Sequence, residues 1–285
     1  MFQAMLAICR DAIGHFNGDD GWALASHVAL SILLAMFPFL IFVTAVAGFA
    51  GSPELAAEAA HLLFEAWPPE VAAPVAREIE TLVTVPRFDL LTIGILLAVF
   101  LASNGVEAVR TALNRAYRVQ ETRPFYLLRL QSVTFVVLGA IGLILIALAA
   151  IVAPVIWYMA LEELPALSQL TGALTRYRLA IAVIILAIGL IMSHRFLPAR
   201  RQTFGLIWPG VVFTITLWII GGILFGIYIR DVASYGSTYA GLAGIMTSIV
   251  FLYLVGVVMI LGAELNAAIA RFRNGDLAEQ VEPVT

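Results

Sequence analysis

The sequence predicts an all-α polytopic membrane protein, and three observations lead to this fold class. Of its 285 residues, 62% are hydrophobic and only 12% are charged, whereas an average soluble domain carries about 25% charged residues. The mean hydropathy is +0.98. Six long apolar runs recur along the chain. Because so few polar groups cannot cover a surface that faces water, we predict a single integral-membrane domain over residues 1–285.

Each of the six apolar runs predicts one transmembrane helix, because crossing the hydrocarbon core takes about 20 apolar residues. The predicted spans are residues 23–50, 90–111, 131–159, 179–194, 204–229 and 238–263. Before the first span, Phe2, Leu6, Cys9 and Ile13 recur at the spacing of one helix face. This spacing predicts a short interfacial helix, and a polar lead-in explains residues 1–22 equally well.

The arginines orient the predicted bundle through the positive-inside rule. All 16 basic residues are arginine, and with a cytoplasmic N-terminus eleven of them fall on cytoplasmic segments and five on outer ones. We therefore expect both termini in the cytoplasm. The first outer loop is then the only large extramembrane piece, and residues 53–84 predict two amphipathic helices because Leu55, Ala59 and Leu62, and later Val71 and Val75, share helix faces.

Polar side chains at membrane depth gather toward the cytoplasmic side. Thr238 and Glu264 are separated by about 39 Å at the helical rise, which exceeds a hydrocarbon core of about 30 Å. Glu264 is therefore expected near the inner interface. Polar residues of the second span recur every three or four positions. The candidate site consists of Asn104, Glu107, Arg110, Thr111, Asn114, Arg115, Arg118, Glu264 and Asn266.

Two interpretations of this candidate site stay open. In the first, the groups are interfacial and pair structurally, with long side chains that extend to water. In the second, they line a hydrated cavity that opens to the cytoplasm, because ionisable groups within a membrane usually face protein or water. A pair between Glu264 and an arginine in 110–118 fits both interpretations.

Small residues predict where helices approach one another closely. Gly222 and Gly226 form a GxxxG pattern on the fifth span. A second stripe, at a spacing of four, consists of Gly236, Ala240, Gly244 and Ser248. These stripes fit packing within one chain or between the chains of a homo-oligomer. Pro209 also falls within the fifth span, where proline tends to kink a helix.

Several function classes are excluded by what the sequence lacks. The net charge of −3 does not favour a nucleic-acid partner. The four histidines are scattered over different segments, and one cysteine is too few for a disulfide or a cysteine-rich metal site. We therefore predict no catalytic residues, no metal and no cofactor, and we expect that the protein is not an enzyme. In particular, nothing resembles the metal or acid–base cluster of a ribonuclease.

Three long segments resemble the YihY/virulence factor BrkB family, whose members are bacterial inner-membrane proteins. They are DDGWALASHVALSILLAMFPFL at 19–40, NGVEAVRTALNRAYRVQETRPFYLLRLQS at 104–132 and YGSTYAGLAGIMTSIVFLYLVGVVMILGAELNAA at 235–268. The resemblance implies six transmembrane helices with both termini cytoplasmic. The family has carried the label ribonuclease BN, widely regarded as a misassignment, and has been linked to virulence, serum resistance and transport. His27 departs from the aromatic residue expected in many relatives.

The leading functional hypothesis is transport or export of a lipid or another anionic amphiphile through the predicted cavity. Arginine binds phosphate and carboxylate groups through two parallel hydrogen bonds, so membrane lipids are the expected partners. The alternative is a scaffold that does not transport and that docks an envelope partner through outer loop 53–84. Deleting the outer-loop helices would abolish a scaffold role and leave lipid binding at 104–118 intact.

Overall fold

The computed structural model describes residues 2–49, 88–163, 171–232 and 240–275, and within these ranges every regular element is a helix. The all-α prediction is therefore confirmed for the described part of the chain. The helices are α1 (Phe2–Gly18), α2 (Gly21–Phe49), α5 (Phe88–Ala116), α6 (Phe125–Glu163), α7 (Thr171–Phe196), α8 (Phe204–Val232) and α9 (Ala240–Asn274). The predicted outer-loop helices at 53–84 lie outside the described residues.

Four described helices are long and apolar enough to cross a membrane. These segments are Leu96–Ala116, Phe125–Ile146, Phe204–Tyr228 and Met246–Asn274. Two shorter apolar segments, Gly21–Met36 and Ala180–Phe196, belong to α2 and α7. Several helices run past the apolar stretches that predicted them: α6 begins at Phe125, and α9 continues to Asn274. These extensions contain polar residues, and the helical backbone therefore continues beyond the end of the apolar pattern.

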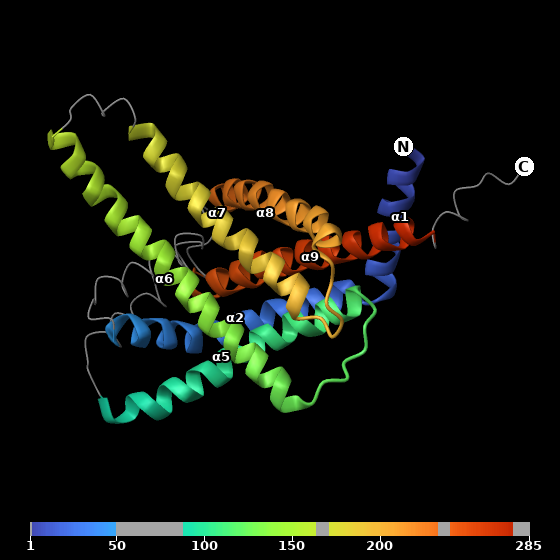
Figure 1. The fold of residues 1–285 in the computed structure, drawn as a ribbon, viewed down its shortest axis with the longest axis horizontal. Helices are drawn as coiled ribbons and strands as arrows, with labels where there is room; N and C mark the ends of the chain where they lie inside the picture. The colour runs from blue at the N-terminus through green and yellow to red at the C-terminus, as the bar shows by residue number, and fades with distance from the viewer. Residues whose placement is uncertain (1, 50–87, 164–170, 233–239, 276–285) are drawn as a thin grey trace, which may run out of the picture.

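The described turns gather at one end of the bundle, here named the polar end. At this end α2 begins, α5 ends, α6 begins, α7 ends, α8 begins and α9 ends (Figure 1). Helix α1 crosses the end of α9 there, steeply inclined to it (Figure 1). Toward the opposite end, named the apolar end, α6 and α7 diverge from α2 and α5 (Figure 1).

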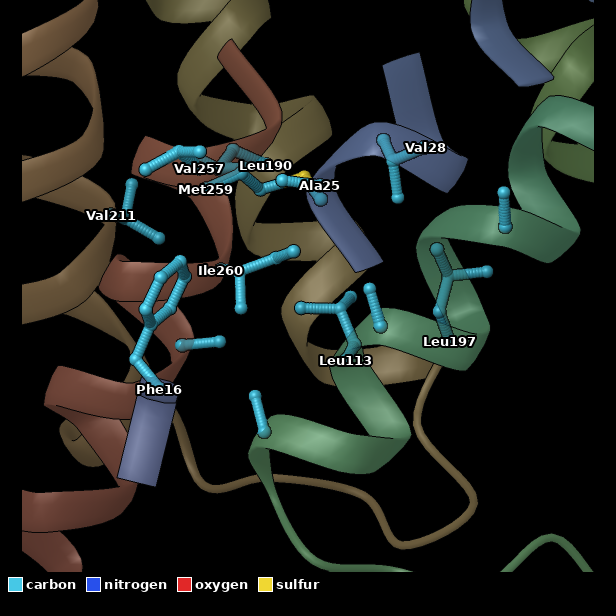
Figure 2. Packing of buried hydrophobic residues seen from close by; sticks show 14 of the residues in the cluster. Phe16, Ala25, Val28, Leu113, Leu190, Leu197, Val211, Val257, Met259 and Ile260 are labelled. Carbon is cyan, nitrogen blue, oxygen red and sulfur yellow. The ribbon is translucent and has the colours of Figure 1, made fainter. Parts of the chain in front are cut away.

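A hydrophobic core near the polar end joins six helices (Figure 2). Ile260 of α9, Leu113 of α5 and Ile207 of α8 are each at most 1% exposed. Small residues let the helix backbones approach closely: a Cβ at Gly105 would lie 3.2 Å from the Cβ of Ala35. In a bilayer this close packing is a main source of helix association, because lipid tails are as apolar as the helices themselves.

Helices α8 and α9 are in close backbone contact through Gly210 and Gly262. A Cβ at Gly210 would collide with the carbonyl oxygen of Gly262, and a Cβ at Gly262 would collide with Thr214 Oγ1. By contrast, a Cβ at Gly222 or Gly226 would meet no described atom within 4 Å. Within this chain, the predicted GxxxG pattern is therefore not the contact between α8 and a described neighbour.

The second predicted stripe is only partly covered by the described residues, so its role in helix packing stays a prediction. Gly236 lies outside the described residues, and the side-chain surroundings of Ala240 and Gly244 are likewise not described. Ser248 is buried, with 1% of its surface exposed. Packing of either stripe between chains of a homo-oligomer stays a prediction.

We expect Gly210→Ala to lower the stability of the folded protein by about 1–3 kcal/mol, the usual cost of overpacking. The added methyl group would force α8 away from α9. The measurement is thermal unfolding of the purified protein in detergent. Gly226→Ala on the same helix is the matched control and should not lower the melting temperature, because the added methyl group meets no described atom and alanine favours the helix. Equal melting temperatures for Gly210→Ala and the unmodified protein would contradict the close contact.

Candidate functional site

The C-terminal end of α5 places Arg118 beside α9. The helix ends at Ala116, and Arg118 adopts the left-handed backbone conformation with φ 52°. The Arg118 N–H donates to the Arg115 carbonyl at 3.0 Å, and the Val119 N–H donates to the Asn114 carbonyl at 2.9 Å. A left-handed residue other than glycine costs about 1–2 kcal/mol, so the contacts of this side chain must offset that strain.

Arg118 joins two carboxylates that come from opposite parts of the sequence. Its Nη2 lies 3.1 Å from Glu264 Oε2 on α9 and 3.3 Å from Asp19 Oδ2 in the turn between α1 and α2. Arg115 Nε lies 3.7 Å from the other Asp19 oxygen. These four residues, Asp19, Arg115, Arg118 and Glu264, are named the Arg118 cluster. Its two positive and two negative charges balance.

Burial differs sharply across the Arg118 cluster. The Glu264 side chain is 1% exposed, whereas the Arg118 side chain is 31% exposed. Arg118 therefore covers the buried carboxylate from the solvent side. The pair between Glu264 and an arginine in 110–118, which fits both interpretations of the candidate site, is present, and Arg118 is the partner.

A second polar network links α8, α9, α7 and the end of α5 around Asn266. Asn266 Oδ1 accepts the N–H of Gly210 at 2.7 Å, and Asn266 Nδ2 donates to Tyr117 Oη at 3.2 Å. Tyr117 Oη lies 2.7 Å from His194 Nδ1. These four residues are named the Asn266 network. Asn266 and His194 are 1% and 0% exposed, so these two side chains lie inside the helix bundle.

The backbone N–H of Gly210 determines which atoms donate hydrogen bonds in the Asn266 network. The Gly210 N–H can only donate, so the Asn266 oxygen faces it and the Asn266 amide nitrogen faces Tyr117. The Tyr117 hydroxyl then has its own proton free to donate to His194 Nδ1. This assignment puts the imidazole proton on Nε2, which is buried without a hydrogen-bond partner among the described residues.

The first part of the predicted polar stripe contacts α6 instead of α9. Arg129 Nη1 donates to Asn104 Oδ1 at 2.9 Å and to Glu107 Oε1 at 2.7 Å. Its guanidinium carbon lies 3.5 Å from the centroid of the Phe100 ring. Arg110 is buried and donates to the Leu128 carbonyl at 2.9 Å.

The two remaining residues of the polar stripe, Thr111 and Asn114, form hydrogen bonds within α5 or to neighbouring turns. Thr111 Oγ1 donates to the Glu107 carbonyl of its own helix at 2.9 Å. Asn114 donates to Glu121 at 3.0 Å and accepts the N–H of Ala199 at 2.8 Å. The nine candidates are thus divided among the Arg118 cluster, the Asn266 network, contacts to α6, a local bond within α5 and contacts to the turns. That they line one hydrated cavity stays a prediction.

The turn after α5 is held by a charged pair outside the apolar spans. Glu121 Oε2 lies 2.7 Å from Arg123 Nη2, and Arg123 also donates to the Leu197 carbonyl at 2.8 Å. Hydrogen bonds from the Arg123 side chain and backbone N–H, and from Asn114, lower the pKa of Glu121 to about 2. The α5–α6 turn is therefore tied to the α7–α8 turn through a group that stays ionised at neutral pH.

Several residues that complete these networks were not predicted from the sequence. Asp19, Tyr117, His194 and Arg129 were not among the candidates. Tyr117 sits next to Arg118 in the sequence, and His194 is a titratable residue at the end of an apolar run. Either of these sequence features could have placed the residue in the candidate site. Among the described residues, no group of three or more His, Cys, Asp or Glu residues could hold a metal ion.

Comparison with known proteins gives one family and several distant relatives. The family model described as Virulence factor BrkB matches residues 12–283. The ribonuclease-like protein YfkH of Bacillus subtilis is 28% identical, over 92% of this chain and 94% of that protein. A UPF0761 membrane protein of Rhodospirillum centenum is 27% identical, over 96% of this chain and 60% of that protein. A UPF0761 membrane protein of Pseudoalteromonas translucida is 26% identical, over 86% and 80%. No solved structure matches.

We expect Arg118→Gln to destabilise the fold by about 2–3 kcal/mol. Breaking a fully buried pair costs about 3–5 kcal/mol because one charge stays buried alone, and the partial exposure of Arg118 reduces that cost. Adding Glu264→Gln should recover part of the loss, since the stranded carboxylate is then neutral. Thermal unfolding of the single and double variants measures the coupling. Strictly additive effects would contradict a direct pair.

Acid should weaken the turn that contains Glu121. Because the folded state lowers its pKa from 4.5 to about 2, the stabilisation from its ionised form is complete above about pH 4.5 and is lost as the pH falls toward 2. The melting temperature should therefore fall over this range, and Glu121→Gln should flatten that part of the profile. An unchanged profile in the variant would show that Glu121 does not stabilise the fold.

Proposed function

The chain belongs to the Virulence factor BrkB family, and from that premise we propose that it transports a lipid or another anionic amphiphile. The polar end would serve as a gate. One observation carries the proposal: ion pairs and hydrogen bonds from α5, α7, α8, α9 and the α1–α2 turn hold the polar end together, whereas α6 and α7 diverge from α2 and α5 toward the apolar end (Figure 1).

The chemistry of the two ends suits a gate for an amphiphile. Contacts at the polar end are charged or hydrogen-bonded, so they can exchange for water or for a ligand headgroup. The diverging helices expose large apolar side chains, which acyl chains can contact without a desolvation cost. Examples are Ile141 on α6 and Ile184 on α7, which are 45% and 56% exposed.

The proposed topology has six transmembrane helices in the bacterial inner membrane, with α2 and α7 as the two spans that complete the set. Both termini are cytoplasmic in this topology, and the polar end is its cytoplasmic side. Support comes from the positions of four arginines. Arg118 and Arg123 lie in the turn between α5 and α6, and Arg115 and Arg129 flank it, as the positive-inside rule expects. The gate would thus close the cytoplasmic side.

The proposal assigns no catalytic chemistry to the chain. His194, the titratable residue most deeply placed in the Asn266 network, is 0% exposed and contacts Tyr117. A substrate phosphodiester would have to reach such a group for acid–base catalysis. The scaffold alternative depends on outer loop 53–84, which lies outside the described residues, so no described contact favours it.

Weakening the gate should accelerate lipid movement. In vesicles of phosphatidylcholine and phosphatidylglycerol with fluorescent phosphatidylglycerol in the inner leaflet, we expect Glu264→Gln to raise the rate of label arrival in the outer leaflet about tenfold. This factor follows from losing one charge-assisted bond of about 1.5 kcal/mol in the closed state. A membrane-impermeant quencher added outside measures the arrival.

Arg10→Gln is the control for this assay, because Arg10 is exposed on α1 and belongs to neither network. It should leave the rate equal to that of the unmodified protein. If neither the unmodified protein nor Glu264→Gln moves lipid faster than protein-free vesicles, the carrier proposal is wrong.

A further inference from the structure

We propose that the corner between α7 and α8 binds the phosphate group of an anionic membrane lipid. Four arginines form this surface, named the arginine corner: Arg195, Arg200, Arg201 and Arg273. The inference deepens the proposed function, on which its physiological meaning rests, by naming a ligand class and a place for it. It stands on the charges, contacts and exposure of these residues.

Within the described residues, the arginine corner carries positive charge without matching carboxylates. Among the described residues, the arginines in ion pairs are Arg115, Arg118, Arg123, Arg129 and Arg271. None of the four corner arginines makes such a pair in the described part of the chain. Arg200, Arg201 and Arg273 are also exposed. Among the described residues no carboxylate pairs with this charge, and in our proposal an anion from outside the chain balances it.

The side chains of Arg195, Arg201 and Arg273 all contact residues of the short segment 196–205, which also contains Arg200. Arg195 Nη1 donates to the Gln202 carbonyl at 3.0 Å, and its guanidinium carbon lies 4.0 Å from the centroid of the Phe204 ring. The guanidinium carbon of Arg201 lies 5.7 Å from the Phe196 ring centroid. Arg273, from the end of α9, reaches the Gly205 carbonyl at 3.4 Å.

The surface next to the arginine corner suits a lipid better than a free phosphate ion. Phe204 and Trp208 occupy successive turns of α8 and are 55% and 58% exposed. Val212, Ile219 and Ile223 continue the exposed apolar surface along the same helix. Exposed aromatic side chains mark the membrane–water interface. A headgroup at the arginines would therefore have its acyl chains along α8.

The arginines in the sequence-based candidate site are already occupied. Arg110 is buried and donates to the Leu128 carbonyl and to Ser132. Arg118 pairs with Asp19 and Glu264. The geometry therefore moves the expected headgroup contact from the second span to the α7–α8 corner, where guanidinium groups are free to form paired hydrogen bonds with phosphate oxygens.

Native mass spectrometry of the full chain in mild detergent tests this site by titration with phosphatidylglycerol. We expect Arg201→Gln to weaken binding of the first phosphatidylglycerol about tenfold, because a charge-assisted hydrogen bond contributes about 1.5–3 kcal/mol. Arg10→Gln removes one exposed arginine elsewhere and should change binding less than about twofold. Arg201→Lys, which keeps the charge and loses the planar fork, should fall between them.

Three results would overturn the inference. The first is equal weakening by Arg201→Gln and Arg10→Gln, which would indicate diffuse charge attraction. The second is unchanged binding in the double variant Arg200→Gln/Arg201→Gln. The third is displacement of phosphatidylglycerol by inorganic phosphate at equal concentration, which would identify a free-anion site. Thermal unfolding of each variant checks that it folds.

The outcome is independent of the transport assay. If the arginine variants lose the lipid while the unmodified protein moves none across vesicles, the site stands and the carrier proposal fails. If lipid movement is protein-dependent and the arginine variants bind normally, the carrier proposal stands and the arginine corner is wrong.

Discussion

The architecture depends on satisfying one buried carboxylate. Glu264 lies on a helix apolar enough to cross a membrane and is 1% exposed, and an unpaired charge in such a place is costly. Arg118 neutralises it and simultaneously binds Asp19. That single guanidinium therefore fixes the end of α5, the turn between α1 and α2, and the last turns of α9 relative to one another. A left-handed backbone at Arg118 is the local strain that this arrangement requires.

The Asn266 network depends on the same closeness of helices. Gly210 and Gly262 allow the backbones of α8 and α9 to touch, and this contact brings the Gly210 N–H to Asn266. Pro209 precedes that glycine within α8, where a proline tends to kink a helix. Small residues thus permit α8 and α9 to pack closely, and the Asn266 side chain then fixes their relative position through its hydrogen bond to Gly210. Polar bonds and backbone contact together hold the polar end.

The sequence predicted more of the fold than of the site. Apolar runs predicted six of the seven described helices, α2 and α5 to α9, except for their polar extensions, because hydropathy reports where lipid is tolerated and not where hydrogen bonding stops. Helix α1 was indicated only by the spacing of its apolar residues, which a polar lead-in explained equally well. The Glu264–arginine pair was foreseeable from depth along the helix. The division of the polar stripe between α6 and α9 was not foreseeable, because it depends on how α6 crosses α5. Periodicity on one helix cannot reveal which neighbour each residue meets, so the contacts of Arg129 and His194 could not be predicted.

The claim that polar contacts close one end of the bundle is tested most directly by a distance measurement. Spin labels at Gln120, beside the end of α5, and at Asn274, at the end of α9, would report the separation in lipid nanodiscs after Cys9→Ser removes the one native cysteine. Our account predicts one narrow distance distribution in the otherwise unmodified chain and a second, longer population when Glu264→Gln is added. Identical distributions in the two proteins would contradict it.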